Sequence, residues 1–326
     1  MRRIRLAVVF AVSLFLVPPT AEPQQPGTVR IGYLSGNPAS DTQSSIDAFR
    51  RRLQNLGYRE GQDLRIEYRY AEGKYERLPE LAEDLVRLKM DVIFTYGTPG
   101  SIAAKNATRT IPIVFGAVAD PLAAGLVTSL ARPGANITGV TTNNPDLSAK
   151  RMSLLKEALP GASRVAVLAN PDFPPTPKMV TEARLAASAL GIKVQVLQVR
   201  TPAELEKAFG AMTTAKSHAV MVLPDAMFIA ERRQIVELAS RARIPAMYHL
   251  WQFVEAGGLI CYGVDYVESF QQAAGLVDKI LKGAKPAELP VEQPWRFALA
   301  INLKTAKALA LTIPPSVLGR ADQVVE

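Results

Sequence analysis

Short apolar runs and helical stripes alternate along the chain. The runs 29–35 (VRIGYLS) and 64–70 (LRIEYRY) are rich in β-branched and aromatic residues, a composition that favours strands. Between them, Ile46, Phe49 and Leu53 recur at spacings of three and four residues, which places them on one face of a helix. The pattern therefore predicts a strand, a helix and a second strand in succession.

The same alternation continues through most of the sequence. Leu78, Leu81 and Leu85 form the next helical stripe, and Pro99 stands where the first turn of a following helix is expected. Further strands are predicted at residues 91–96, 111–117, 164–170, 193–199, 218–224 and 244–249. Because helices separate these strands, right-handed crossovers and parallel sheets are expected.

The chain contains an internal repeat. RIGYLSGNP, from Arg30, resembles RVAVLANP, from Arg164, and TIPIVFG, from Thr110, resembles RIPAMYH, from Arg243. Equivalent positions are separated by 133 or 134 residues, a nearly constant spacing that indicates two related halves. The repeat and the length of 326 residues predict an α/β protein with two Rossmann-like lobes.

Parallel sheets of this kind bind ligands beyond the carboxyl ends of their strands. If the two lobes face each other, the loops that follow these strands converge on one cleft. The loops concerned are residues 35–38, 96–101, 118–121, 170–175, 224–227 and 248–253.

The first 21 residues differ from the rest of the chain. Three arginines precede an apolar run at residues 6–17, and Ala21 follows shortly afterwards. This is the layout of a signal peptide, and the run is too short to span a bilayer comfortably. The sole cysteine, Cys261, is far from the N-terminus, so a lipid-modified N-terminal cysteine is excluded. We expect a periplasmic protein that is not a lipoprotein; a retained membrane anchor is the alternative.

Composition and motifs exclude several classes of partner. Charged residues make up 21% and hydrophobic residues 48% of the chain, as in a globular protein. The formal net charge is +8, but the basic residues are scattered among acidic ones, so no nucleic acid is expected. The first turns of the two halves, LSGNPASD and LANPDFPP, lack the G-x-G-x-x-G pattern, and no P-loop occurs. We expect no cofactor and no metal.

Catalytic motifs are equally scarce. The chain has two histidines, His218 and His249, and no zinc-binding pattern or G-x-S-x-G elbow. His218 begins an apolar strand, which favours a structural role, whereas His249 lies at a strand end and could face the cleft. An exported hydrolase or isomerase that uses His249 and Asp225 is one alternative to a protein without catalysis. A ligand-sensing module is another.

Four polar residues near strand ends are candidates for holding the charged groups of a ligand. Thr98 and Ser101 flank a predicted helix start, where free N–H groups and the helix dipole attract a carboxylate. Both residue types are also common helix caps. Asp120 and Asp225 end strands in different halves, and each can either pair with a ligand ammonium or cap a helix.

Aromatic side chains with a polar tip gather near the same loops. Such residues suit a small amphipathic ligand, although any one of them can belong to a lobe core instead. The candidates for pocket walls are Tyr33, Tyr96, Tyr248, Trp251 and Tyr262. Ser35 and Asn170, which follow the first strand of each half, complete the predicted ligand-binding residues.

Three long segments resemble a known family. Residues 111–140 (IPIVFGAVADPLAAGLVTSLARPGANITGV), 257–294 (GGLICYGVDYVESFQQAAGLVDKILKGAKPAELPVEQP) and 297–326 (FALAINLKTAKALALTIPPSVLGRADQVVE) are similar to ABC transporter substrate-binding proteins of the tryptophan or aromatic-amino-acid-binding type. The resemblance implies the type I periplasmic-binding fold, in which three crossing strands join two lobes that close on a ligand. It implies crossings near Gly139–Thr142, Gly258–Gly263 and Pro290–Trp295.

The resemblance also implies a division of the chain and a role. Lobe 1 would comprise residues 22–140 and 264–290, and lobe 2 residues 141–263 and 291–326, with the ligand cleft between them. The loops around Thr98, Asp120, Asn170 and Asp225 would clamp the ligand.

We therefore expect a periplasmic solute-binding protein of an ABC importer, without catalysis. Its partners would be a small-molecule solute and an ABC permease in the inner membrane. The solute would be an amino acid or small carboxylate, aromatic in the characterised type, and hinge closure would capture it.

Overall fold

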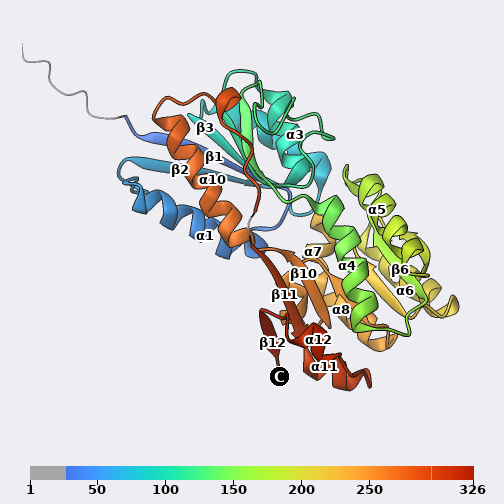
Figure 1. The fold of residues 1–326 in the computed structure, drawn as a ribbon. Helices are drawn as coiled ribbons and strands as arrows, with labels where there is room; N and C mark the ends of the chain where they lie inside the picture. Colours follow the sequence, from blue (N-terminus) through green and yellow to red (C-terminus); the bar gives the residue numbers. More distant parts are fainter. Residues whose placement is uncertain (1–26, 295) are drawn as a thin grey trace, which may run out of the picture.

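The computed structural model describes residues 27–294 and 296–326, so the predicted signal peptide lies outside the described residues. The described chain forms two α/β lobes, each built on one sheet with helices on both faces (Figure 1). In this part of the chain, no helix has the length and apolar character needed to cross a membrane.

The first lobe is a five-stranded parallel sheet in the order β2-β1-β3-β4-β5. Its strands are β1 (Val29–Ser35), β2 (Leu64–Tyr70), β3 (Val92–Tyr96), β4 (Ile113–Val118) and β5 (Ile137–Thr141). Its helices are α1 (Ala39–Asn55), α2 (Leu78–Arg87), α3 (Gly97–Ala107) and α10 (Tyr266–Leu281), with 3₁₀ turns η1 (Tyr75–Arg77) and η3 (Pro286–Glu288). Although α10 comes late in the sequence, it packs beside α1 on this lobe.

The second lobe is a seven-stranded sheet in the order β12-β11-β10-β9-β8-β6-β7. Its strands are β6 (Arg164–Ala169), β7 (Lys193–Gln198), β8 (Ala219–Val222), β9 (Ala246–Tyr248), β10 (Ile260–Val264), β11 (Phe297–Asn302) and β12 (Gln323–Val325). Its helices are α4 (Asn144–Ala158), α5 (Thr176–Ala189), α6 (Leu205–Thr214), α7 (Ala226–Ala230), α8 (Arg232–Arg241), α9 (Trp251–Glu255), α11 (Leu303–Ala308) and α12 (Pro315–Leu318), with a 3₁₀ turn η2 (Pro202–Glu204).

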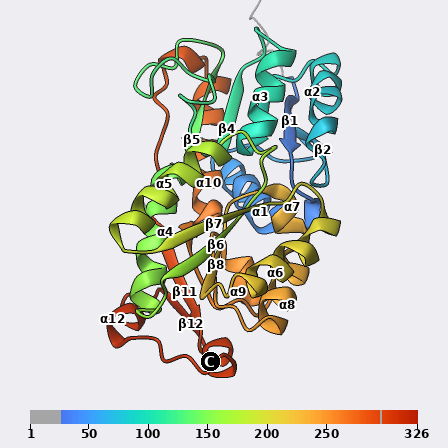
Figure 2. The same cartoon turned by 90° about the vertical axis from the view of Figure 1, so that its right-hand side faces the viewer.

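The predicted repeat is confirmed by the topology. The order β7-β6-β8-β9-β10 reproduces the order β2-β1-β3-β4-β5, and both sets are parallel. The C-terminal segment adds β11, antiparallel to β10, and then β12, parallel to β11. In Figure 2, α12, β12 and the C-terminus lie at the end of the second lobe that is remote from the first.

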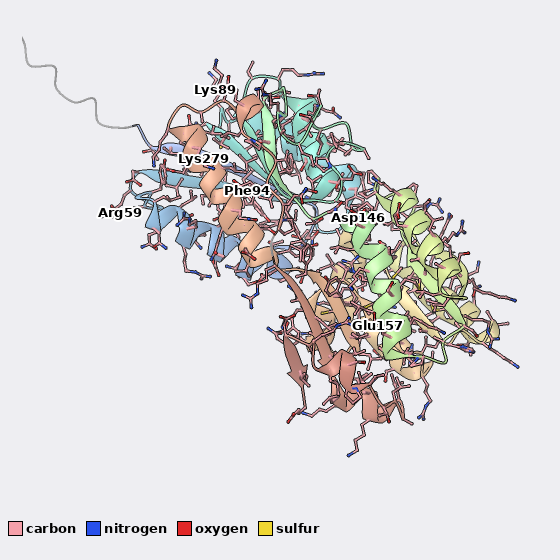
Figure 3. The ribbon with its side chains drawn as sticks, viewed as in Figure 1. Arg59, Lys89, Phe94, Asp146, Glu157 and Lys279 are labelled. Carbon is pink, nitrogen blue, oxygen red and sulfur yellow. The ribbon has the colours of Figure 1, made fainter. Side chains whose placement is uncertain are left out.

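The core of the first lobe is aromatic. Phe94 on β3 stacks on Phe49 of α1, with ring centres 4.3 Å apart, and meets Phe270 of α10 edge-on at 5.0 Å. All three side chains are fully buried. Figure 3 shows Phe94 inside this lobe and the charged side chains of Arg59, Lys89 and Lys279 around its outside. These ring contacts fix α1 and α10 against one face of the sheet.

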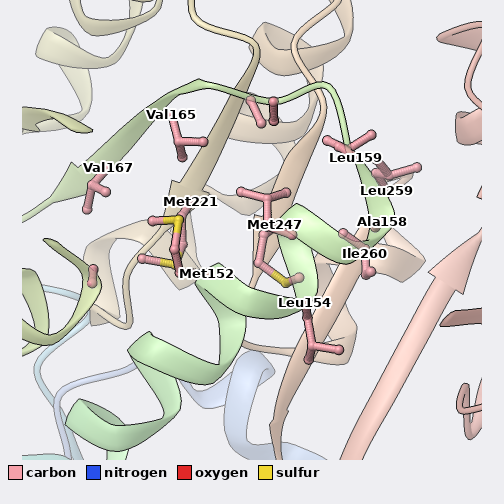
Figure 4. Packing of buried hydrophobic residues seen from close by; sticks show 14 of the residues in the cluster. Met152, Leu154, Ala158, Leu159, Val165, Val167, Met221, Met247, Leu259 and Ile260 are labelled. Carbon is pink, nitrogen blue, oxygen red and sulfur yellow. The ribbon is translucent and has the colours of Figure 1, made fainter. Parts of the chain in front are cut away.

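The core of the second lobe contains several methionines. Met152 of α4 lies beside Met221 of β8 and Met247 of β9, among aliphatic residues such as Val165 and Leu259 (Figure 4). Flexible thioether side chains fill irregular gaps between a helix and a sheet. This packing holds α4 on the second sheet, so the chain has changed lobes before α4 begins.

Three chain segments join the lobes. The first runs from β5 to α4, the second from β10 to α10, and the third from η3 to β11. The crossing expected at Gly258–Gly263 lies later, between Val264 and Tyr266. The reason is that Ile260–Val264 is strand β10, which pairs with β9 and β11 inside the second sheet.

Gly139 permits a close approach between β4 and β5. A Cβ at this position would lie 2.0 Å from the carbonyl oxygen of Phe115 and 2.5 Å from its ring. We expect Gly139→Ala to lower the free energy of unfolding by at least about 1–3 kcal/mol, as overpacking does, in urea or thermal unfolding.

Gly275→Ala is the matched control for this substitution. Gly275 lies in α10 with nothing within 4 Å of the added methyl group. Alanine should therefore raise the stability by about 0.5–1 kcal/mol through its higher helix propensity. Wild-type stability of Gly139→Ala would contradict the close pairing of β4 and β5.

Candidate ligand-binding cleft

A cavity lies between the carboxyl ends of the two sheets, and residues of both lobes line it. Four tyrosine or phenylalanine side chains line it. Tyr96, at the end of β3, meets Tyr266 of α10 edge-on with ring centres 5.5 Å apart. Tyr75, which follows β2, faces Phe173, which follows β6, at 6.3 Å across the cleft. The cavity therefore offers ring surfaces from both lobes to the same occupant.

Asp225 supplies the formal negative charge of this cavity. Its side chain caps α7, because one carboxylate oxygen accepts hydrogen bonds from the N–H groups of Met227 (2.9 Å) and Phe228 (3.1 Å). The other oxygen accepts from the amide of Asn170 at 3.0 Å and from the hydroxyl of Tyr75 at 2.7 Å. Burial raises the pKa of Asp225, and these hydrogen bonds oppose that shift.

Tyr75 carries the contact across the cleft. Its hydroxyl donates to Asp225 and accepts from the N–H of Ala226 at 2.9 Å, so one side chain of the first lobe satisfies two groups of the second. Burial and the nearby carboxylate raise the pKa of Tyr75 well above 10, which keeps the hydroxyl protonated and able to donate. This contact requires the lobes to be closed.

Two ion pairs also bridge the lobes at the edge of the cleft. Arg232 of α8 lies 2.7 Å from Asp41 of α1, whose side chain is 2% exposed. Lys178 of α5 lies 2.6 Å from Asp120 and is half exposed. The first pair is largely removed from solvent, and the second is largely screened by it, so the first has the greater influence on closure.

Asp120 acts both as a cap and as a bridge between lobes. It accepts a hydrogen bond from the N–H of Ala123 at 3.0 Å, and it pairs with Lys178. Burial alone would raise the pKa of Asp120, but the Ala123 and Lys178 contacts outweigh it and lower the pKa. Asp120 does not line the central cavity; with Thr98 and Lys178 it lines a separate one at the rim. The cation that pairs with Asp120 in this structure is therefore Lys178 and not a ligand ammonium.

His249, which follows β9, lines the central cavity and is 1% exposed. Burial and the positive charge of Arg151 lower the pKa of His249 well below 6.5, despite an opposing interaction with the carbonyl of Val222. The imidazole is therefore neutral at physiological pH. Asp225 and His249 both face this cavity, but the four hydrogen bonds of Asp225 go to other groups.

The backbone is strained where β4 reaches the cavity. Ala117 has a φ of 68°, and the register of β4 against β5 shifts between Gly116 and Val118. A left-handed alanine costs on the order of 1–2 kcal/mol and persists only where surrounding structure enforces it. Such bulges and strained residues occur often beside binding sites, and Ala117 lines this one.

The structure brings some of the predicted residues together at the central cavity. Tyr96 and Asp225 line it directly, and Asn170 lies behind Asp225 and orients its carboxylate. The start of α3 also reaches the cavity through Gly97 and Pro99.

The hydroxyl groups predicted nearby are used within their own lobe. Thr98 accepts a hydrogen bond from the N–H of Ala119 at 3.2 Å, which ties the start of α3 to the end of β4. Ser101 bonds to Thr95 (2.7 Å) and to the carbonyl of Gly97 (2.8 Å). Ser35 closes a turn by accepting from the N–H of Asn37 at 3.0 Å. These hydroxyls shape the loops that surround the cavity.

Three of the predicted aromatic residues lie elsewhere. Tyr33 is fully buried in the first core beside Phe94, and Tyr248 is stacked on Phe253 in the second at 4.6 Å. Tyr262 stacks on Phe297 at 6.1 Å, along the β10–β11 pair. Their side chains point from strands into lobe packing, so none of them lines the central cavity. Trp251 lines a second cavity near the hinge.

Sequence reasoning missed Tyr75, Phe173 and Tyr266 as cavity walls. Phe173 lies inside the predicted loop 170–175, so its ring was an available signal. Tyr75 follows β2, and the predicted cleft loops do not include the segment after this strand, although it lies at the same edge of the sheet. Tyr266 begins α10 at a crossing, and its position depends on where the chain changes lobes.

Comparison with known proteins agrees with this architecture. Residues 37–325 match the family described as ABC transporter substrate binding protein. A tyrosine-binding protein of Clostridioides difficile (strain R20291) is 28% identical over 281 residues, which cover 86% of this chain and 80% of that protein.

Solved structures show the same fold. The ABC domain of a Streptococcus pneumonia protein in complex with L-Trp has a TM-score of 0.86 and 27% identity, covering 92% of this chain and 100% of that one. The ligand-free, open structure of a substrate binding protein with adhesive properties from Clostridium difficile has a TM-score of 0.67 and 26% identity, with coverage of 91% and 99%. The lobes are therefore arranged more like those of the tryptophan complex, which agrees with the contacts across the cleft.

These findings confirm the type I periplasmic-binding fold and the resemblance to binding proteins for aromatic amino acids. The alternative of an enzyme based on His249 and Asp225 is wrong, since the family and its solved members are ligand-binding components of transporters. With 289 consecutive residues, 37–325, matched to one family and two lobes closed over one cavity, the chain belongs to the ABC transporter substrate binding proteins.

Proposed function

We propose that this protein captures a small aromatic amino acid, or a related aromatic carboxylate, and delivers it to the permease of an ABC importer. The observation that carries the proposal is the ring of aromatic side chains around the central cavity. Tyr75 and Tyr96 come from the first lobe, Phe173 comes from the second, and Tyr266 lies at the hinge. A relative named tyrosine-binding protein and a similar solved structure in complex with L-Trp support the same ligand class.

The binding energies are adequate for such a ligand, although the cavity of about 40 Å³ must widen to admit it. An aromatic side chain buries about 150–250 Å², which contributes on the order of 4–6 kcal/mol. A micromolar complex has a binding free energy of roughly −8 kcal/mol. This is the net value, after the contacts have offset the translational and rotational freedom that the ligand loses. Contacts to the charged ends of the ligand must therefore supply a substantial remainder.

The charged ends have complementary surroundings in the cavity. The first turn of α3 presents its backbone through Gly97 and Pro99, and no side chain caps this helix. A carboxylate there would benefit from the helix dipole and from the N–H groups of the first turn, to which Pro99 contributes none. Asp225 favours an ammonium group through its charge, because its hydrogen-bonding capacity is largely used.

Transport requires export and a membrane partner. The N-terminal arginines and apolar run support secretion through a signal peptide into the periplasm. In this arrangement the closed form presents surfaces of both lobes at once, which a permease in the inner membrane can distinguish from the open form.

The proposal is tested by isothermal titration of refolded, ligand-stripped protein. The panel comprises L-tyrosine, L-tryptophan, L-phenylalanine, L-leucine and a neutral sugar. We expect one aromatic amino acid bound per chain with micromolar or tighter affinity, and weaker binding of leucine. Stoichiometric binding of the sugar, with no heat from any aromatic amino acid, would overturn the ligand class.

Tyr75→Phe should weaken ligand binding without lowering the stability of either lobe. The substitution leaves the Asp225 carboxylate and the Ala226 N–H with one partner fewer in the closed form only, at a cost of about 1–3 kcal/mol. We expect roughly a five- to 100-fold loss of affinity and a nearly unchanged melting temperature of the unliganded protein.

Tyr58→Phe is the matched control for the Tyr75 variant. Tyr58 also donates to an aspartate, Asp278 at 3.0 Å, but both residues belong to the first lobe. Its loss should lower the melting temperature slightly and leave ligand affinity unchanged. If both variants lose affinity equally, the contact of Tyr75 is not specific to closure.

The two inter-lobe ion pairs should differ in their effect on binding. Arg232→Met leaves the largely buried Asp41 without its cation on closure, so we expect at least a tenfold loss of affinity. Lys178→Met removes a pair open to solvent, worth about 0.2–1 kcal/mol, so the loss should be at most about fivefold and should vanish in molar salt. Titration calorimetry at low and high salt measures both, and equal losses would contradict the assigned burial.

A further inference from the structure

His249 stands out among the residues that line the central cavity. Its side chain is almost fully buried, and neither ring nitrogen has a hydrogen-bond partner of acceptable geometry within the described chain. It also lines a second cavity of about 260 Å³ near the hinge, so it lies between two spaces. The ring rests against Phe253 at 5.5 Å, which holds it in place from the core side.

A buried imidazole without hydrogen-bond partners is unfavourable unless a molecule in a neighbouring cavity supplies them. A buried donor or acceptor without a partner costs about as much as its lost hydration, which is why such groups are rare. A neutral imidazole presents one N–H donor and one nitrogen acceptor. The Val222 carbonyl acts on the ring without a hydrogen bond of acceptable geometry, so an occupant of one of the two adjacent cavities is the remaining source of partners.

The charges near His249 restrict what that occupant can place there. Arg151 of α4 is fully buried, and its Nε donates to the carbonyl of Tyr262 at 2.7 Å. The positive charge of Arg151 acts on His249 and disfavours a second positive charge at that position. A ligand ammonium is therefore better placed towards Asp225, and the group at His249 is a neutral or negatively charged polar atom.

We propose that His249 hydrogen-bonds the polar atom of the ligand's aromatic ring, so that the site selects a phenol or an indole over an unsubstituted phenyl ring. This inference rests on the proposed function, because it specifies which aromatic ligands the same cavity accepts. A phenol can accept from the imidazole N–H, and either a phenol or an indole N–H can donate to the other nitrogen. A phenyl ring leaves His249 unpartnered on closure.

Selectivity of this kind is expected to be large. A site built to hydrogen-bond a substrate hydroxyl rejects the analogue without it, because the buried groups of the site are then left unpaired. We therefore expect the wild-type protein to bind L-tyrosine at least tenfold more tightly than L-phenylalanine.

The test compares these two amino acids by isothermal titration in four proteins. They are the full-length mature wild type, His249→Phe, His249→Gln and the control His218→Phe. His218 is the other histidine of the chain and bonds to Arg164 and Ser163 at the far end of the second lobe's strands. Thermal unfolding of each variant establishes that it is folded.

The expected result is a loss of discrimination that depends on the ring of His249. His249→Phe should lower the affinity for L-tyrosine at least tenfold and change the affinity for L-phenylalanine by less than threefold. The ratio of the two affinities should then be close to one. His249→Gln, which keeps a donor and an acceptor, should retain part of the preference, and His218→Phe should retain all of it.

Three results would overturn the inference. One is equal wild-type affinity for tyrosine and phenylalanine, which needs no variant to fold. Another is an equal loss of affinity for both ligands in His249→Phe, which would place His249 at the amino and carboxylate groups that the two ligands share. The third is wild-type binding of neither L-tyrosine nor L-tryptophan; the proposed function fails only if the rest of the aromatic panel also shows no binding.

Discussion

The hydroxyl of Tyr75, held between the carboxylate of Asp225 and the N–H of Ala226, is the contact on which the closed cleft depends. It joins the lobes at the wall of the cavity itself, whereas the ion pairs of Asp41 and Asp120 join them at the rim. Because all of these groups can be hydrated when the lobes separate, closure exchanges water for protein contacts at a small net gain. A ligand that adds buried ring surface to both lobes can therefore decide the equilibrium.

The cavity is electrically asymmetric, and this asymmetry limits its ligands. Asp225 contributes a negative charge on one part of the wall, and Arg151 acts behind His249 on another. Buried charges are costly, so an occupant whose own polarity matches this arrangement gains more than an apolar one of the same size. The aromatic walls set the shape of the ligand, and these polar groups set its orientation.

Much of the fold could be predicted from the sequence, but less of the site. The spacing of the repeat predicts two related halves, and each strand is predicted from its own apolar run; the structure then shows that the halves share one strand order. The side on which a strand residue points was harder to predict, because alternate residues face opposite sides of the sheet and both sides here are buried. The sequence predicts Tyr33 and Tyr248 as cavity walls for this reason, whereas both face a core. Tyr75 and Lys178 become partners of Asp225 and Asp120 only through the arrangement of two lobes, which no local pattern encodes.

The central claim is that the lobes close on an aromatic amino acid, and small-angle X-ray scattering tests it directly. The radius of gyration of the ligand-stripped protein should fall when saturating L-tyrosine or L-tryptophan is added, to the value of the closed structure described here. Stoichiometric binding of either amino acid with an unchanged, larger radius of gyration would contradict capture by closure.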